Sequence, residues 1–217
     1  MSDKKILLLR HGETEWNRAM RFQGSVDIPL SDIGERQAVA AGGRIRPWEP
    51  EAVFISPLQR TRRTAELALD KAQKNITFVD DLREICFGDW EGKGFGDLKK
   101  IGGCYDRWVD EPYSVPIPNA ESRDSVLERS ARVLERIKSC DAERILLVSH
   151  GGILRGVLAV ALEVPFSCTW KHFFLSNCSL TGISWDGGRF HLNFYNDCLH
   201  LAFLDAEEPC RVPVWFQ

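Results

Sequence analysis

Three continuous apolar runs constrain the fold of this chain more than any other feature of its sequence. They are Ile6–Leu9, Ala52–Ile55 and Ile145–Val148. A strand with one wet face alternates apolar and polar residues, so a run without alternation is typical of a strand that is covered on both faces. Helical segments are expected between and after these runs, at 31–46, 59–69, 122–138 and 152–162. The alternation predicts an α/β fold, a three-layer α/β/α sandwich with a largely parallel central sheet.

Residues 84–119 interrupt this alternation. They hold six glycines and three prolines, which favour turns and loops over long regular elements. We expect one or two short helices there, in an excursion that carries substrate-facing loops and does not form a separate domain. The length of 217 residues then predicts a single domain over 1–217. A hairpin is expected over 180–196, and the tail, 199–217, is expected to help shape the pocket.

Charge and composition exclude several classes of protein. Lys and Arg total 28 against 31 Asp and Glu, a net charge of −3, which argues against nucleic acid as a partner. The apolar runs are far shorter than the ~20 residues of a membrane helix, so no membrane span is expected, and no signal peptide is expected before the first run. The seven cysteines lie at least ten residues apart, so we expect reduced thiols and no zinc site. A cytoplasmic protein is predicted.

Basic and imidazole side chains follow each of the three apolar runs. The first run ends in Arg10-His11-Gly12, the second leads to Arg60, and the third ends in Ser149-His150-Gly151. Each motif alone is weak, because a lone His-Gly is usually a turn and a lone arginine at a helix start is usually solvated. The carboxyl ends of parallel strands meet at one sheet edge, however, and helix N-termini there favour anions. Their convergence predicts a receptacle for a dianionic phosphate.

A longer set of motifs resembles the histidine phosphatase superfamily, the phosphoglycerate-mutase-like enzymes. The blocks occur in family order over about residues 5–201 and, around Glu84, are most similar to small bacterial broad-specificity and α-ribazole-phosphate-type phosphatases. They are Leu9-Arg10-His11-Gly12-Glu13-Thr14-Glu15-Trp16-Asn17, Phe22-Gln23-Gly24, Pro29-Leu30-Ser31-Asp32-Ile33-Gly34, Ser56-Pro57-Leu58-Gln59-Arg60-Thr61, Leu82-Arg83-Glu84, Gly88-Asp89-Trp90-Glu91-Gly92, Val148-Ser149-His150-Gly151-Gly152, Asn177-Cys178-Ser179, and Asn196-Asp197 through His200-Leu201.

The resemblance implies a role for each residue of the site. His11 would become phosphohistidine, Glu84 would protonate the leaving oxygen and then activate water, and His150 would complete the pocket and stabilise the transition state. Six more residues would bind the phosphate or support its pocket: Arg10, Asn17, Gln23, Gly24, Arg60 and Gly151. The arginines supply the positive charge that phosphoryl transfer needs and lower the pKa of a neighbouring histidine. A metal-independent enzyme without a cofactor is therefore predicted.

Three functions remain open at this point. The first is a phosphomonoesterase that hydrolyses a small phosphorylated metabolite through phosphohistidine. The second is a phosphoglycerate mutase, although the segment Glu84-Ile85-Cys86-Phe87-Gly88 departs from the Glu-Arg-His-Tyr-Gly pattern typical of cofactor-dependent mutases. The third is a catalytically silent phosphate-binding or regulatory module, which would have lost one of the key residues. Near 120, Asn119-Ala120 replaces the two glycines of many relatives, a departure that puts substrate contacts from this loop in doubt.

Overall fold

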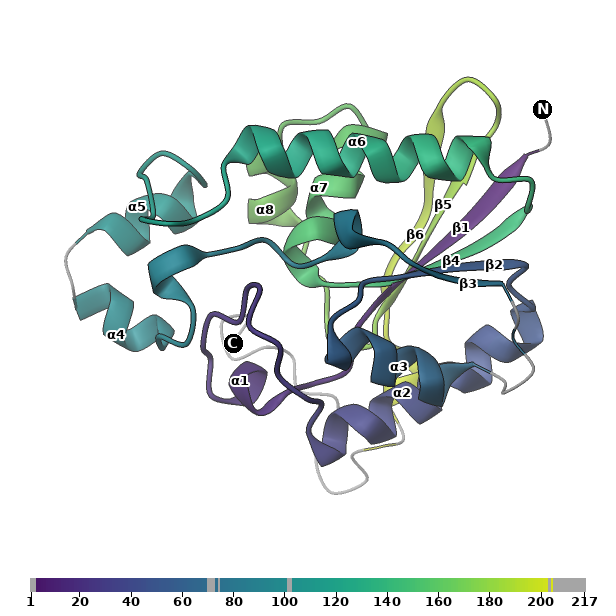
Figure 1. Ribbon diagram of the computed structural model, residues 1–217, viewed down its shortest axis with the longest axis horizontal. Helices are drawn as coiled ribbons and strands as arrows, with labels where there is room; N and C mark the ends of the chain where they lie inside the picture. The colour runs from purple at the N-terminus through teal and green to yellow at the C-terminus, as the bar shows by residue number, and fades with distance from the viewer. Residues whose placement is uncertain (1–2, 70–72, 74, 101–102, 203, 205–217) are drawn as a thin grey trace.

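The three apolar runs lie side by side in one mixed sheet of the computed structural model, which describes residues 3–69, 73, 75–100, 103–202 and 204 (Figure 1). Its parallel strands are β1 (Lys4–Arg10), β2 (Ala52–Ile55), β3 (Ile76–Phe78) and β4 (Arg144–Ser149). The expected hairpin adds β5 (Leu180–Trp185) and β6 (Phe190–Asp197) in antiparallel orientation. Within the described residues the strand order is β3-β2-β4-β1-β5-β6, which confirms the largely parallel sheet.

Helices cover both faces of this sheet, as the continuous apolar runs require. One layer contains α2 (Asp32–Ile45) and α3 (Gln59–Ala68), and the other contains α6 (Arg123–Ser139) and α7 (Gly151–Ala161) (Figure 1). Successive side chains of a strand point to opposite faces. Ile6 and Leu8 accordingly pack with the α6 and α7 layer, whereas Leu7 and Leu9 pack with the α2 and α3 layer. The predicted three-layer sandwich is confirmed.

Serine caps mark the starts of the two long helices. The Ser31 hydroxyl accepts a hydrogen bond from the Gly34 N–H at 3.1 Å, and the Ser122 hydroxyl accepts one from the Ser125 N–H at 3.2 Å. Two short helices were not predicted, α1 (Glu15–Arg18) and α8 (Phe166–His172). At four and seven residues they are too short to show helical periodicity in the sequence.

The described part of the 84–119 excursion holds two short α-helices, α4 (Phe95–Lys100) and α5 (Cys104–Asp110), together with the 3₁₀ helix η3 (Gly88–Trp90). It builds an apolar cluster of its own, in which Phe87, Trp90 and Trp108 pack with Phe22 from the N-terminal region and Ile153 from α7. The excursion is therefore anchored to the sandwich by buried aromatic rings. Its assignment to one domain stays a prediction.

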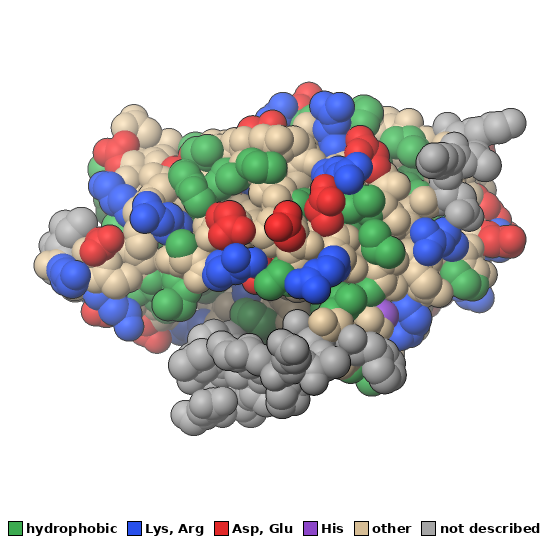
Figure 2. Space-filling view, turned by 90° about the horizontal axis from the view of Figure 1, so that it is seen from below, with side chains coloured by type: hydrophobic (Ala, Val, Ile, Leu, Met, Phe, Trp, Pro, Cys, Tyr) green, Lys and Arg blue, Asp and Glu red, His purple; other side chains and the backbone are tan. Residues whose placement is uncertain are grey.

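The remaining described segments are the 3₁₀ helices η1 (Arg46–Trp48), η2 (Asp80–Leu82) and η4 (Leu199–Leu201). The expected role of the tail falls outside the described residues from 205 onward. On the face shown in Figure 2, Lys and Arg side chains are interspersed with Asp and Glu, in keeping with the net charge of −3. Among the described helices, none is both long and apolar enough to cross a membrane.

Candidate active site

The carboxyl ends of β1 and β4 open into a cavity of about 1270 Å³. Eight of the nine site residues expected from the sequence line it: Arg10, His11, Asn17, Gln23, Gly24, Arg60, Glu84 and Gly151. The ninth, His150, lies directly behind the wall of the cavity, with its ring centroid 5.1 Å from that of His11. The structure therefore brings together residues that are up to 141 positions apart in the chain, from Arg10 to Gly151.

His11 follows the last residue of β1 and is 2% exposed. Its Nδ1 lies 2.7 Å from the Gly12 carbonyl oxygen. A carbonyl can only accept, so this contact assigns the ring proton to Nδ1 and leaves the lone pair on Nε2. Burial lowers the pKa of His11 well below its ordinary value, and Arg60 and Arg10 lower it further. The arginines were the cause expected from the sequence, but burial is the larger one. Both effects favour the neutral imidazole.

Gly12 is required by the close packing around His11. Its N–H donates to the Thr64 hydroxyl at 3.0 Å. A Cβ atom at this position would lie 2.4 Å from the Gly34 carbonyl oxygen at the start of α2. The first turn of α2 thus presses against the strand end and fixes the backbone that carries the histidine.

Arg60 lies in the first turn of α3 and is completely buried. Its guanidinium donates to the carbonyls of Val26 and Gly24, each at 2.8 Å, and its Nε donates to His150 Nδ1 at 3.1 Å. Burial lowers the pKa of Arg60 to about 10, although Glu84 opposes this shift. These partners hold a cationic side chain in place without neutralising its charge.

Arg10, a half-buried residue, supplies the second guanidinium of the site. One of its Nη atoms donates to the Leu175 carbonyl, whereas its Nε is buried without a hydrogen-bond partner among the described residues. Burial lowers the pKa of Arg10 to about 10, and the nearby Arg155 lowers it too. A Cβ atom at Gly151 would lie 3.4 Å from this Nε. An unsatisfied, buried cationic donor costs free energy that a bound anion would recover.

His150 is completely buried and satisfied at both ring nitrogens. Because its Nδ1 accepts from Arg60 Nε, its Nε2 carries the proton and donates to the Ser56 hydroxyl at 2.7 Å. Burial is the main cause that lowers the pKa of His150 well below its ordinary value, followed by Arg60. A direct contact between His150 and a phosphate oxygen would require Nε2–H to exchange Ser56 for the ligand, or Nδ1 to release Arg60 and gain a proton.

Glu84 lies against the N-terminus of α7. Its Oε1 accepts from the N–H groups of Ile85 at 2.9 Å and Ile153 at 3.0 Å, and its Oε2 accepts from the Gly152 N–H at 3.1 Å. A Cβ atom at Gly152 would lie 2.5 Å from Oε1, so only glycine lets the carboxylate approach this closely. Oε2, with a single acceptor contact, has the greater capacity for a further proton or ligand.

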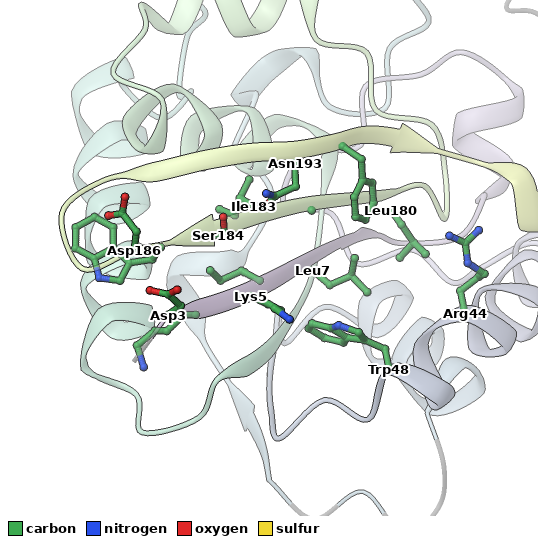
Figure 3. Close-up of a pocket in the computed structure, with 15 residues that line it drawn as sticks. Asp3, Lys5, Leu7, Arg44, Trp48, Leu180, Ile183, Ser184, Asp186 and Asn193 are labelled. Carbon is green, nitrogen blue, oxygen red and sulfur yellow. The ribbon is translucent and has the colours of Figure 1, made fainter. Parts of the chain in front are cut away.

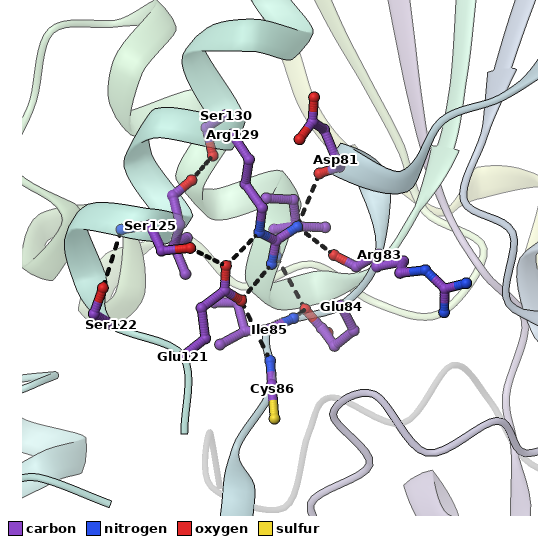
Figure 4. A network of polar contacts seen from close by, with 12 residues as sticks. Asp81, Arg83, Glu84, Ile85, Cys86, Glu121, Ser122, Ser125, Arg129 and Ser130 are labelled. Atoms are coloured by element: carbon purple, nitrogen blue, oxygen red, sulfur yellow. Dashed lines mark hydrogen bonds and ion pairs between the residues drawn. The ribbon is translucent and has the colours of Figure 1, made fainter. Parts of the chain in front are cut away.

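A buried ion pair holds the segment that carries Glu84 (Figure 4). Arg129 on α6 makes a bidentate contact with Glu121, at 2.7 and 2.9 Å. The same guanidinium donates to the carbonyls of Asp81 and Arg83, which lie just before Glu84 in the chain. The chain direction at the carboxylate is therefore set from outside the cavity.

The smaller polar residues complete the lining. Asn17 Oδ1 accepts from the Thr14 N–H at 3.1 Å and from Asn177 Nδ2 at 3.2 Å. These two contacts orient the amide so that its donor group remains for a ligand. Gln23 is buried, and its Oε1 has no hydrogen-bond partner within the described part of the chain. Gly24 has a φ of +53°, a conformation that favours glycine, and its carbonyl accepts from Arg60.

Four residues that hold or line the site were given no role from the sequence: Ser56, Thr64, Arg155 and Asn177. Ser56 and Asn177 stand inside motifs that resemble the family, but only the structure shows what they contact. Arg155 lines the cavity from α7 and donates to the Phe173 carbonyl at 2.6 Å. Its spacing of four residues from Gly151, one helical turn, is the signal that could have found it.

A second cavity of about 480 Å³ lies beside the amino-terminal half of β1, near Trp48 and Leu180 (Figure 3). Its described lining contains neither histidine nor cysteine, so it offers no nucleophile of the kind present at His11. Over the part of the chain that the structure describes, no group of three or more His, Cys, Asp or Glu residues is placed to hold a metal ion. Metal independence stays a prediction.

The buried His11 lies in the same cavity as Arg10 and Arg60, an arrangement that suits phosphoryl transfer, and comparison with known proteins agrees with this chemistry. Residues 6–198 match the histidine phosphatase superfamily (branch 1), and the chain belongs to this family. The uncharacterized phosphatase PhoE of Bacillus subtilis is 32% identical over 91% of this chain and 96% of its own. The probable phosphoglycerate mutase GpmB of Salmonella paratyphi C is 35% identical over 83% and 85%, respectively. The predictions of the family and of a phosphatase are confirmed.

The solved structures give the same result for the fold. The phosphoserine phosphatase of Entamoeba histolytica, in complex with 3-phosphoglyceric acid, superposes with a TM-score of 0.80 at 29% identity. The match covers 91% of this chain and 99% of that one. The sandwich of the two proteins is therefore shared almost from end to end.

Proposed function

We propose that this protein is a phosphomonoesterase that hydrolyses a small phosphorylated metabolite through a phosphohistidine at His11. The observation that carries this proposal is the contact between His11 Nδ1 and the Gly12 carbonyl. It leaves the Nε2 lone pair available for in-line attack on phosphorus, while Arg10 and Arg60 supply the charge that stabilises the equatorial oxygens. The donor group of Asn17 adds a neutral contact to the same oxygens.

In the first step the Nε2–P bond forms as the bond between phosphorus and the ester oxygen breaks. Glu84 gives its proton to the departing oxygen, so the alcohol leaves neutral. In the second step Glu84 takes a proton from water, the water oxygen attacks phosphorus, and the P–N bond breaks to release inorganic phosphate and free His11. His150, which is itself held by Ser56, keeps the Arg60 guanidinium in position during both steps. The residues of the site are sufficient for this cycle without a metal ion.

The intermediate is the direct test of this mechanism. A phosphorus–nitrogen bond is labile in acid and persists in base, unlike a serine phosphate ester. Rapid quenching with labelled 4-nitrophenyl phosphate is expected to trap an acid-labile, base-stable label on the peptide that contains His11. His11→Ala is expected to abolish both the label and phosphate release, whereas His191→Ala, on the exposed side of β6, serves as the matched control. A label on any other residue would overturn the mechanism.

Metal independence has its own test. Dialysis against a strong chelator is expected to leave phosphate release unchanged, because the guanidiniums of Arg10 and Arg60 already provide positive charge in the cavity. Activity that disappeared on dialysis and returned specifically with magnesium or zinc would contradict this part of the proposal.

Mutase activity is the second candidate, and the 35% identity to GpmB favours keeping it. The two activities share the phosphohistidine and differ in what accepts its phosphoryl group. Incubation with 3-phosphoglycerate is expected to release phosphate faster than it forms 2-phosphoglycerate. Efficient interconversion with negligible phosphate release would retain His11 as the nucleophile and replace the phosphatase assignment by a mutase.

A further inference from the structure

One side of the cavity is built from aromatic rings, which the proposed chemistry at His11 does not use. The rings that line it form a continuous array, which we call the aromatic wall: Phe22, Phe87, Phe95, Tyr105, Trp108 and Trp170. Phe22 contacts Phe95 with ring centroids 4.9 Å apart, mostly edge to face. Trp108 and Trp170 meet at the same centroid distance, with the ring planes nearly perpendicular at 86°. These rings come from the N-terminal region, the 84–119 excursion and α8.

The aromatic wall is more than the exposed edge of a hydrophobic core. Trp108 is 1% exposed, yet its indole Nε1 has no hydrogen-bond partner among the described residues. A buried tryptophan usually finds an acceptor for this N–H. Phe95 and Trp170 are half-buried, so their ring surfaces still border the open cavity. The wall thus combines accessible flat apolar surface with a buried donor that lacks an acceptor.

Arg155 joins the aromatic wall to the phosphate site. Its guanidinium carbon lies 4.9 Å from the Trp170 ring centroid, and its charge lowers the pKa of Arg10. A phosphate held at Arg10 and Arg60 would therefore direct the rest of a substrate along Arg155 toward the wall. The part of the substrate that meets the rings is the alcohol of the ester.

We propose that the physiological substrate is the phosphomonoester of an alcohol that carries a planar aromatic group, which stacks in the aromatic wall. This rests on the proposed phosphatase function and specifies its substrate class. Ligand sites typically enclose about 300–1,000 Å³, and this cavity of about 1270 Å³ is larger. A small polar ester such as phosphoserine would leave the flat apolar surface in contact with water, which forfeits the binding free energy that ring burial provides.

The test compares esters with equal chemistry at phosphorus. Ethyl phosphate and 2-(2-naphthyl)ethyl phosphate both release a primary alcohol, so they differ in ring contacts and little in leaving-group reactivity. The kcat/KM for phosphate release is expected to be at least about tenfold higher for the naphthyl ester, given the contribution of one buried aromatic ring. The kcat/KM for phosphoserine is expected to be similar to that for ethyl phosphate.

Variants of the aromatic wall test whether its rings cause the preference for the naphthyl ester. Trp170→Ala is expected to remove most of the tenfold advantage of the naphthyl ester, so that the kcat/KM values of the two esters approach each other in this variant. Trp170→Phe keeps a ring and is expected to restore most of the advantage. If Trp170→Ala folds poorly, Phe95→Ala provides a second substitution in the wall, in a different helix. Phe78→Ala on β3, an exposed ring (55%) outside the cavity, is the matched control.

The outcomes separate this inference from the function on which it rests. If the wild-type protein released phosphate from none of these esters, the phosphatase proposal itself would be refuted. Phosphate release with equal kcat/KM for the two esters would retain the phosphatase and overturn the aromatic substrate class. Equal losses for both esters in Trp170→Ala and Phe95→Ala would also overturn it, because the wall would then act only through stability.

Discussion

The floor and the wall of the cavity are built in opposite ways. The floor consists of Arg10, His11, Arg60 and His150, which follow strands or start a helix and are held by short hydrogen bonds to backbone and side-chain atoms. The aromatic wall draws most of its rings from the 84–119 excursion and from α8, where ring edges and faces supply the contacts. The floor is polar, and hydrogen bonds orient its side chains. The aromatic wall is apolar, and ring packing determines its shape.

This difference separates chemistry from selection. Phosphoryl transfer needs charges and a lone pair at set positions, which the rigid carboxyl edge of a parallel sheet provides. Recognition of the alcohol needs surface that suits one substrate, and loops on a fixed scaffold are where such surface changes most easily. Glu84 stands where the two meet, because it begins the excursion and its carboxylate rests on α7.

The largest effect is expected at this junction. Glu84→Gln keeps the shape but cannot cycle a proton, so kcat for ethyl phosphate is expected to fall by ~10²–10⁴. Phosphorylation of His11 by 4-nitrophenyl phosphate is expected to fall less, because nitrophenolate leaves without a proton. Single-turnover kinetics measure both steps. Glu135→Gln on the exposed face of α6 is the control. Equal losses with both esters would argue that Glu84 belongs to the structural floor and is not the acid.

The next largest effect is expected on stability. It measures how much the Arg129–Glu121 ion pair stabilises the segment that carries Glu84. Arg129→Met leaves the Glu121 carboxylate without its bidentate partner in a largely buried position. Removal of one member of such a pair costs about 3–5 kcal/mol. The free energy of unfolding in urea is expected to drop by about 3 kcal/mol. Adding Glu121→Leu is expected to recover part of it, because no buried charge then remains unpaired.

The same substitution tests whether the clamp positions Glu84. Because Arg129 holds the carbonyls of Asp81 and Arg83, kcat of the folded Arg129→Met protein is expected to fall more for ethyl than for 4-nitrophenyl phosphate. A loss of stability with both rates unchanged would show that the clamp supports the fold alone.

A pH-dependent effect of intermediate size distinguishes the floor from the wall. His11 and His150 have pKa values well below normal in the folded protein, against about 6.5 in the unfolded chain. Below pH 6.5 the unfolded chain therefore binds more protons, so the free energy of unfolding decreases as pH falls, by up to about 1.4 kcal/mol per pH unit for each histidine. Urea unfolding between pH 7.5 and 5 measures the slope.

Single substitutions show which histidine causes the pH dependence of the free energy of unfolding. His11→Asn and His150→Asn are each expected to flatten it between pH 6.5 and 5, and the double variant is expected to flatten it most, whatever the change in stability at pH 7.5. Trp170→Phe in the wall is expected to leave it unchanged. Slopes that match the wild type in both histidine variants would contradict the buried neutral state of the floor.

The sequence predicted the floor far better than the wall, for a physical reason. Burial on both faces leaves an unbroken apolar run, a helix start leaves a serine cap, and parallel strands meet at one edge, so the positions of His11 and Glu84 at one cavity follow from local patterns and the family resemblance. The aromatic wall depends on contacts such as Phe22 with Phe95 and Trp108 with Trp170. Such contacts between distant segments leave no periodicity along the chain.

The tautomers of the two histidines were equally out of reach from the sequence. They depend on which neighbour faces each ring nitrogen, namely the Gly12 carbonyl for His11, and Arg60 with Ser56 for His150. Residue types alone identify the candidates for phosphoryl transfer. Only the placement of donors and acceptors decides which nitrogen holds the lone pair.

The smallest effect is expected where the excursion turns back toward α6. Asn119 has a φ of +60°, in the left-handed region, and its side-chain amide donates to Asp89 at 2.9 Å. This conformation explains why asparagine can stand where many relatives carry glycine, since it tolerates the left-handed region better than most residues. Asn119→Ala combines backbone strain with a lost hydrogen bond and is expected to cost about 1 kcal/mol. Asn119→Gly relieves the strain and is expected to stay within about 0.5 kcal/mol of the wild type.

Thermal and urea unfolding measure both Asn119 variants, and kcat/KM for the naphthyl and ethyl esters measures their activity. Because Asn119 is exposed and absent from the cavity lining, both esters are expected to react as in the wild type. The backbone of the excursion would then be shown to vary in stability without disturbing either the floor or the rings. A selective loss for the naphthyl ester would instead show that this turn sets the shape of the aromatic wall, which would make the two regions less separable than their construction indicates.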